Sequence, residues 1–135
     1  FILLQHFGCK LPIHGSGHNK RHYLAADDFA RAVMLLVREG EFGEVYNVGS
    51  HEERTNLEMA RMICDAFGHD VGEWVQFVED RPFNDARYSI EASRIEALGW
   101  VPHRRLVDEL PHIVAWYREN EERFRAVMGF GKTSM

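Results

Sequence analysis

The stretch GEVYNVGSHEERTNLEMARMICDAFG, residues 43–68, decides the fold that the sequence predicts. Its first part, residues 43–50, places β-branched and aromatic residues between two glycines, which predicts a buried strand. Its second part predicts a helix, because Thr55 and Glu58 have capping-box spacing and apolar residues then recur every three or four positions. Gly68 is expected to end that helix. A strand that leads into a helix favours an α/β fold.

A second helix is predicted over residues 27–40. Asp27 can cap it, Asp28 suits the positive end of its dipole, and Gly40 stands where a left-handed residue ends a helix. The expected apolar stripe consists of Ala30, Val33, Met34 and Val37.

The rest of the chain continues the alternation of strands and helices. Short strands are predicted within residues 10–15 and 73–80, and a glycine-rich loop over residues 15–21. Further helices are predicted at 1–8, 91–100 and 108–128, the last with Asp108 as its cap and Pro111 in its first turn, before a flexible tail over 126–135.

Composition excludes several classes of protein. The 135 residues carry a formal net charge of -5, so a general nucleic-acid surface is not expected. No stretch approaches the roughly 20 apolar residues that span a bilayer. Cys9 and Cys64 form no CxxC pair, which argues against a disulfide scaffold or zinc ribbon and favours a reducing, cytoplasmic location.

Familiar catalytic and metal motifs are not convincing here. His14, His18 and His22 are four residues apart, but glycines interrupt any helix that would align them, so no metal site is predicted. The GFGKTS segment at 129–134 contains GK[ST] without the rest of a phosphate loop, and no GxGxxG turn or GxSxG elbow is present.

Four arginines stand on predicted loops beside Gly, Pro or Asn: Arg21, Arg54, Arg81 and Arg87. A guanidinium group donates two parallel hydrogen bonds and therefore suits a diphosphate. Physical chemistry alone leaves an anion-binding role and a plain surface role equally open, and Arg54 fits the surface role better than the others do.

Five segments together carry a resemblance to a known family: LPIHGSG, YLAADDFARA, GEVYNVGSHEERTN, FVEDRPFNDARY and LGWVP. In this order and spacing they resemble the C-terminal half of nucleotide-sugar 4,6-dehydratases, of the dTDP-glucose or UDP-glucose type, in the extended short-chain dehydrogenase/reductase family. DRPFNDARY is the most specific segment, because related epimerases and decarboxylases usually keep only an arginine there. The resemblance implies that residues 1–125 form the nucleotide-sugar-binding part of such a fold.

The resemblance also implies a substrate site. The segment Pro12–His14 would line the base and ribose, and Arg21 and Arg81 would hold the diphosphate. His14 replaces a tyrosine of many bacterial relatives, as in the UDP-glucose branch of plants, and Asn84 replaces a frequent histidine. The implied substrate-binding residues are Pro12, Ile13, His14, Arg21, Asn56, Arg81, Asn84 and Asp85.

The family's cofactor is NAD, bound mainly by an N-terminal Rossmann domain that this sequence does not contain. The catalytic Tyr-x-x-x-Lys, Asp-Glu pair and Thr are not found either, so no catalytic residue is expected within the chain. Residues 23–37 and 43–49 normally pack on that cofactor domain, so exposed apolar surface is expected near Val33, Leu36, Val45 and Val48. The resemblance further implies a homodimer.

Two alternatives remain open from the sequence. The chain could belong to another extended short-chain dehydrogenase/reductase, such as a nucleotide-sugar epimerase or decarboxylase. It could instead be a non-catalytic module that binds a nucleotide sugar or another subunit. The dehydratase interpretation requires the side chains of Arg21 and Arg81 to converge on one diphosphate.

Overall fold

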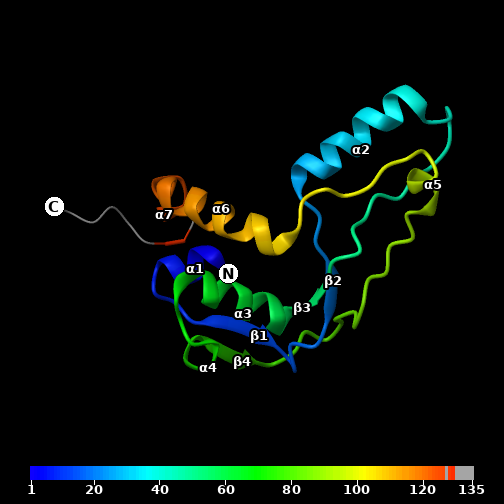
Figure 1. The fold of residues 1–135 in the computed structure, drawn as a ribbon. Coiled ribbons are helices and arrows are strands. Elements are labelled where there is room, and N and C mark those ends of the chain that lie inside the picture. Colours follow the sequence, from blue (N-terminus) through cyan, green and yellow to red (C-terminus); the bar gives the residue numbers. More distant parts are fainter. Residues whose placement is uncertain (127, 130–135) are drawn as a thin grey trace.

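The structure is a computed structural model that describes residues 1–126, 128 and 129. Eleven helices and strands follow one another along these residues (Figure 1). They are α1 (Ile2–His6), β1 (Leu11–His14), β2 (Lys20–His22), α2 (Ala26–Glu39), β3 (Glu53–Thr55), α3 (Asn56–Phe67), α4 (Val71–Trp74), β4 (Val75–Val78), α5 (Ser93–Glu96), α6 (Leu106–Glu119) and α7 (Glu122–Arg125). The mixture of helices and strands agrees with the predicted α/β class.

The strands form two separate pairs. β1 lies parallel to β4, with Leu11 opposite Val75 and His14 opposite Val78. β2 lies antiparallel to β3, with Arg21 opposite Arg54. Lys20–His22 therefore belongs to a strand, although the glycine-rich segment was predicted as a loop through residue 21.

Helix α3 is the centre of the larger lobe. Figure 1 shows it between the β1–β4 pair and α6. On its β-sheet side, Ala60 and Cys64 pack on Leu11 and Ile13. On its other side, its buried residues meet α6 in a cluster of Met59, Ile63, Leu110 and Val114. The helix therefore holds the two halves of this core together.

The local signals predicted for α3 are confirmed. The Thr55 hydroxyl accepts from the Glu58 backbone N–H at 3.0 Å, and the Glu58 carboxylate accepts from the Thr55 N–H at 2.7 Å. Gly68 ends the helix in the left-handed conformation. These contacts lie within a few residues of one another, which is why sequence spacing predicts them.

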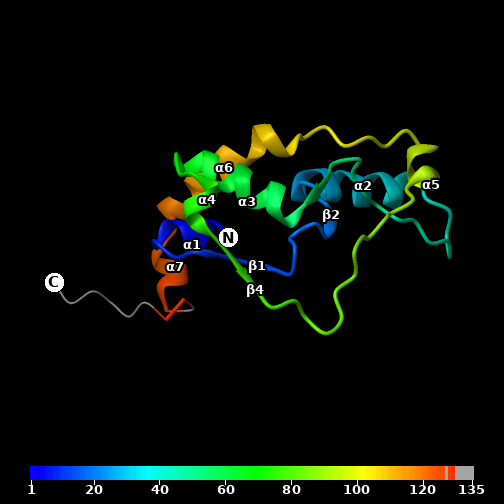
Figure 2. The same ribbon diagram turned by 90° about the horizontal axis from the view of Figure 1, so that it is seen from below.

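A second lobe contains α2, α5 and the extended segments that join them to the rest (Figure 2). Its core consists of Ala32, Ala92, Ile95 and Trp100, with Leu24, Leu35, Leu36, Tyr46 and Val48 packed around it. The strand predicted over residues 43–50 is wrong, because these residues pair with no strand among those described. Side-chain pattern alone cannot supply the partner strand that a ladder needs.

Several expectations for α2 are also wrong. The helix begins after Ala25 without a side-chain cap, so Asp27 is not the cap. Gly40 has φ −72° and ψ 144°, which is extended backbone rather than left-handed. The helix buries Asp28 and Ala32. The apolar stripe of Ala30, Val33, Met34 and Val37 lies on the opposite, exposed side of the helix, in agreement with the exposed apolar surface expected near Val33.

Exposed apolar surface is present at some of the positions where it is expected. Val33 is 42% exposed and Val45 is 75% exposed, whereas Leu36 and Val48 are partly buried in the second core. The expectation is therefore confirmed for two positions and wrong for the other two. Phe29 and Phe42 add to the exposed apolar surface near α2.

Helix α6 differs at both ends from the predicted helix over 108–128. It begins at Leu106, whose N–H donates to the Glu52 carboxylate at 2.6 Å, so Asp108 lies in the first turn and is not the cap. Pro111 then lies inside the helix, beyond the first turn. The helix ends at Glu119 and α7 follows, and the predicted tail falls partly on residues 127 and 130–135, outside the described residues.

The lengths and compositions of the helices bear on membrane insertion. Across the residues that the structure describes, every helix is too short or too polar to cross a membrane.

Candidate functional site

The carboxyl ends of β1 and β4 lie at the same edge, because the two strands are parallel. Just beyond them, the Gly15 N–H donates to the Val78 carbonyl at 3.0 Å. The His14 ring Nδ1 lies 3.1 Å from the Glu79 carbonyl oxygen. The loops that follow the two strands therefore start side by side, at the end of a parallel pair where α/β folds often bind ligands.

Two glycines allow the close packing at this edge. Gly15 has φ +57°, and a Cβ there would lie 2.6 Å from an Asp80 carboxylate oxygen. Gly17 has φ +73°, and a Cβ there would lie 2.6 Å from the Ile13 Cγ2 atom. A side chain at either position would meet both a backbone penalty and a steric clash.

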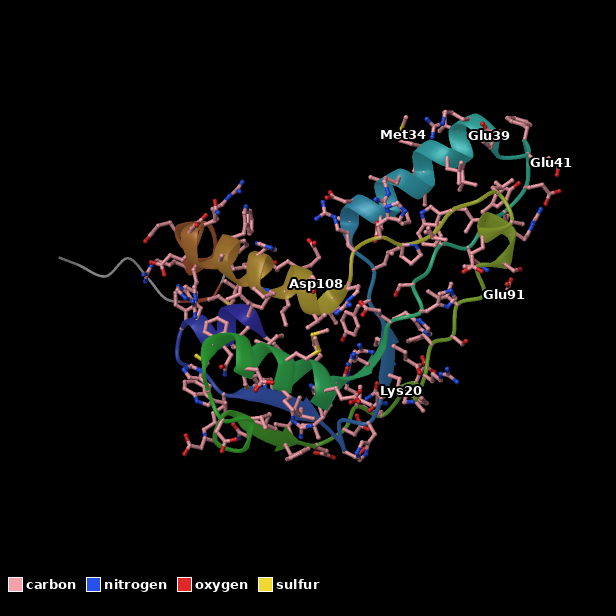
Figure 3. All side chains as sticks on the ribbon, in the orientation of Figure 1. Lys20, Met34, Glu39, Glu41, Glu91 and Asp108 are labelled. Atoms are coloured by element: carbon pink, nitrogen blue, oxygen red, sulfur yellow. The ribbon has the colours of Figure 1, made fainter. Side chains whose placement is uncertain are left out.

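The loop after β4 is fastened to the segment that enters β2. The Lys20 N–H donates to the Ala86 carbonyl at 2.8 Å. Asn19 Nδ2 and Arg21 Nη1 both donate to the Asp85 carbonyl, each at 3.1 Å. Figure 3 labels Lys20 at this junction. Residues 19–21 and 85–86 are thus held together although they are far apart in the sequence.

Helix α3 starts at the same junction. The Asn56 N–H donates to the Asn19 carbonyl at 3.0 Å, and the Leu57 N–H donates to the Gly17 carbonyl at 3.1 Å. Asn56 is half-buried there. The hydrogen bonds place the predicted residue Asn56 beside the segment that carries Arg21.

Ion pairs separate the four loop arginines into two kinds. Arg54 Nη2 lies 3.6 Å from a Glu52 oxygen, and Arg87 forms an ion pair with Glu53. Within residues 1–126, 128 and 129, the guanidinium groups of Arg21 and Arg81 have no carboxylate partner. These are the two arginines that the family resemblance assigned to the diphosphate.

The paired arginine belongs to a small charged network. The hydrogen bond from Arg87 holds the pKa of the Glu53 carboxyl below its usual range, and Lys20 acts in the same direction. The Lys20 ammonium lies 3.5 Å from that carboxylate. Because Arg87 already has a carboxylate partner, it is a poorer candidate for an external anion than Arg21.

Tyr88 is a member of this site that sequence reasoning missed. The Arg21 guanidinium lies over its ring, 4.5 Å from the centroid, and its hydroxyl donates to the Asp85 carboxylate. That hydrogen bond raises the pKa of Tyr88, while the charges of Arg21 and Arg81 lower it. Tyr88 stands three residues after Asp85, a spacing that gave no signal by itself.

The remaining predicted residues have different surroundings. Pro12 is exposed, but the Ile13 side chain is 1% exposed and belongs to the core. Asn84 Nδ2 donates to an Asp80 carboxylate oxygen at 2.7 Å. Asp85 meets Arg21 through its backbone carbonyl rather than through its carboxylate. The binding roles of all of these residues stay predictions.

A cavity of about 330 Å³ lies elsewhere, between the β2–α2 connection and α6. Its lining includes three carboxylates, and its single arginine, Arg104, is paired with Asp27 and Glu109. Such a lining repels a diphosphate.

As for metals, no group of three or more His, Cys, Asp or Glu side chains suited to a metal ion occurs in the part of the chain that is described.

The profile of the GDP-mannose 4,6 dehydratase family matches residues 5–110, a range that contains every predicted site residue. The chain belongs to this family. The resemblance inferred from the motifs is confirmed at that level, together with the extended short-chain dehydrogenase/reductase fold.

Curated relatives of this family member include plant and bacterial enzymes. The chain is 44% identical over 129 residues to the trifunctional UDP-glucose 4,6-dehydratase/UDP-4-keto-6-deoxy-D-glucose 3,5-epimerase/UDP-4-keto-L-rhamnose-reductase of Arabidopsis thaliana, covering 96% of this chain and 19% of that protein. It is 39% identical over 127 residues to the dTDP-glucose 4,6-dehydratase of Neisseria gonorrhoeae, covering 86% and 37% respectively. The chain therefore spans well under half the length of these relatives.

Solved structures of related enzymes are similar to this chain in fold. The dTDP-glucose 4,6-dehydratase of Streptomyces venezuelae, determined with NAD bound, is 36% identical with a TM-score of 0.85, covering 90% of this chain and 38% of that one. A UDP-glucose 4-epimerase of Thermotoga maritima matches at 23% identity and a TM-score of 0.81, with 89% and 38% coverage, and shows the shared fold.

Proposed function

We propose that this chain is the substrate-binding part of an NAD-dependent nucleotide-sugar 4,6-dehydratase, which converts dTDP-glucose or UDP-glucose to the 4-keto-6-deoxy sugar nucleotide. One observation carries the proposal. Among four candidate loop arginines, Arg21 and Arg81 lack carboxylate partners within the described residues, whereas Arg54 and Arg87 are paired. Unpaired guanidinium groups suit a diphosphate, because each can donate two parallel hydrogen bonds to phosphate oxygens. We expect the two groups to converge on the same diphosphate.

The proposed substrate lies along the edge formed by the ends of β1 and β4. Pro12, Ile13 and His14 would follow the base and ribose, and Asn56 would contact the nucleotide from the start of α3. Asn84 and Asp85 complete the implied site. The 44% identity to a plant enzyme named for UDP-glucose supports UDP as the first nucleotide to test, and dTDP as the second.

NAD is proposed as the cofactor of the complete enzyme. The residues of this chain do not fit it, because no turn with GxGxxG spacing follows β1, β2, β3 or β4. The redox and elimination steps are therefore assigned to residues outside this chain, and the residues here bind and orient the substrate.

We further propose a cytoplasmic homodimer in a rhamnose or other deoxysugar pathway, with residues 1–125 as the substrate-binding unit.

The test measures binding of UDP and of dTDP to the full-length protein by calorimetry. Arg21→Ala and Arg81→Ala should each weaken binding about tenfold or more, because a hydrogen bond to a charged group contributes roughly 1.5–3 kcal/mol. Arg38→Ala, which removes an exposed arginine at the end of α2, is the matched control. Unchanged affinity in both test variants would refute the proposal.

An epimerase or decarboxylase remains the second candidate, supported by the fold shared with the UDP-glucose 4-epimerase. The two reactions give different products. The full-length protein is incubated separately with UDP-glucose and with dTDP-glucose, and the products are analysed by mass spectrometry. A 4,6-dehydratase should give a 4-keto-6-deoxy product whose mass is lower by one water molecule. An epimerase would leave the mass of the sugar nucleotide unchanged.

A further inference from the structure

The Arg21 guanidinium is held on one edge and left open on the other. Its Nη1 donates to the Lys20 carbonyl at 2.6 Å and to the Asp85 carbonyl at 3.1 Å. Among the residues that the structure describes, its Nε and Nη2 atoms have no hydrogen-bond acceptor. The open edge therefore keeps the pair of parallel donors that a phosphate needs.

Tyr88 supports one face of the same guanidinium. Its ring centroid lies 4.5 Å from the central carbon of Arg21. The ring is itself fixed, because its hydroxyl donates to the Asp85 carboxylate. Arg21, Asp85 and Tyr88 thus form a closed set of three contacts in which each residue touches the other two.

The rest of the junction holds this set in place. The Asp85 carbonyl also accepts from Asn19 at 3.1 Å, and the neighbouring Ala86 carbonyl accepts from the Lys20 N–H at 2.8 Å. Tyr88 is 52% exposed, so its ring is not needed to fill the core. Its position against Arg21 is therefore a feature of the site rather than of the fold.

We propose that Tyr88 is a positioning residue: it holds the Arg21 guanidinium with its open edge toward the diphosphate of the nucleotide sugar. This inference rests on the proposed function, since it needs the diphosphate to be the ligand of Arg21. A guanidinium that is already oriented loses less side-chain freedom when the ligand binds. Tyr88 acts through Arg21 and does not itself contact the ligand.

The test compares UDP affinity of the full-length protein by calorimetry in three variants. Tyr88→Leu removes the aromatic face and should weaken binding about two- to fivefold, the range for a cation–π contact at an exposed site. Tyr88→Phe keeps the ring and should recover most of that loss. Phe83→Leu is the matched control, because Phe83 is in the same loop and is 95% exposed.

A double-mutant cycle separates positioning from a direct or structural role. In an Arg21→Ala background, Tyr88→Leu should cause no further loss of UDP affinity. The inference is overturned if Tyr88→Leu binds UDP as tightly as the unmodified protein, if Phe recovers nothing, or if the same loss persists without Arg21. Failure of the proposed function gives a different result, in which Arg21→Ala and Arg81→Ala leave UDP affinity unchanged.

Discussion

Removal of the Asp28 carboxylate should destabilise the protein more than any surface change. The side chain is 0% exposed and accepts hydrogen bonds from the backbone N–H groups of His103 and Arg104, at 3.1 Å and 2.9 Å. It also forms an ion pair with Arg31. Asp28 therefore joins the first turn of α2 to the segment that leads into α6.

The expected cost of Asp28→Ala follows from these contacts. Two backbone N–H donors, of His103 and Arg104, lose the buried carboxylate that accepts from them, at about 1–3 kcal/mol each, so the loss should be roughly 2–6 kcal/mol. The Arg31 pair adds little, because that side chain is 42% exposed. With a urea dependence of about 2 kcal/mol per molar, the midpoint of unfolding should fall by roughly 1–3 M.

The assay is urea unfolding followed by far-UV circular dichroism, with Asp27→Asn as the control. Asp27 is the neighbouring carboxylate, but its side chain is 73% exposed and, among the described residues, forms an ion pair only with the partly exposed Arg104. The control should lower the stability by less than about 1 kcal/mol. If Asp28→Ala unfolds at the same urea concentration as Asp27→Asn, the reasoning from the buried Asp28 carboxylate is refuted.

Two further predictions concern individual side-chain contacts. Thr55→Ala removes the hydroxyl half of the capping box and should lower the unfolding free energy by about 1 kcal/mol in the same urea assay, whereas equal stability would contradict the cap. Glu53 has a lowered pKa, chiefly through its hydrogen bond with Arg87, so its stabilising effect is present above its unfolded pKa of about 4.3 and is lost as pH falls through the folded pKa. Glu53→Gln should therefore flatten the acid end of the stability curve; an unchanged profile below pH 5 would count against that network.

The accuracy of the sequence predictions followed the range of the interactions involved. The capping box and the left-handed Gly68 depend on neighbouring residues, and both are found in the structure. The strands around Ile13 and Phe77 are also found, because each has the other as its partner. The segment 43–50 has an equally apolar pattern but pairs with no strand among the described residues. A strand depends on a partner that its own residues do not specify.

The same limit applied to α2 and to α6. Asp28 was expected to interact with the helix dipole, whereas its main partners lie more than seventy residues later. The start of α6 was misplaced because the acceptor for the Leu106 N–H is Glu52, from a distant segment. The spacing of neighbouring residues does not predict hydrogen bonds between segments that are far apart in the sequence.

The sequence by itself determined the family of this protein, its α/β character and the identity of Arg21 and Arg81 as candidates for an anion. Only the tertiary structure decided which arginines are already neutralised, since Arg54 and Arg87 meet carboxylates in space. It also revealed Tyr88 against Arg21, because β2 and the loop after β4 are brought together by backbone hydrogen bonds between residues far apart in the chain. Charge pairing and ring stacking depend on distance in space, which the order of residues does not specify.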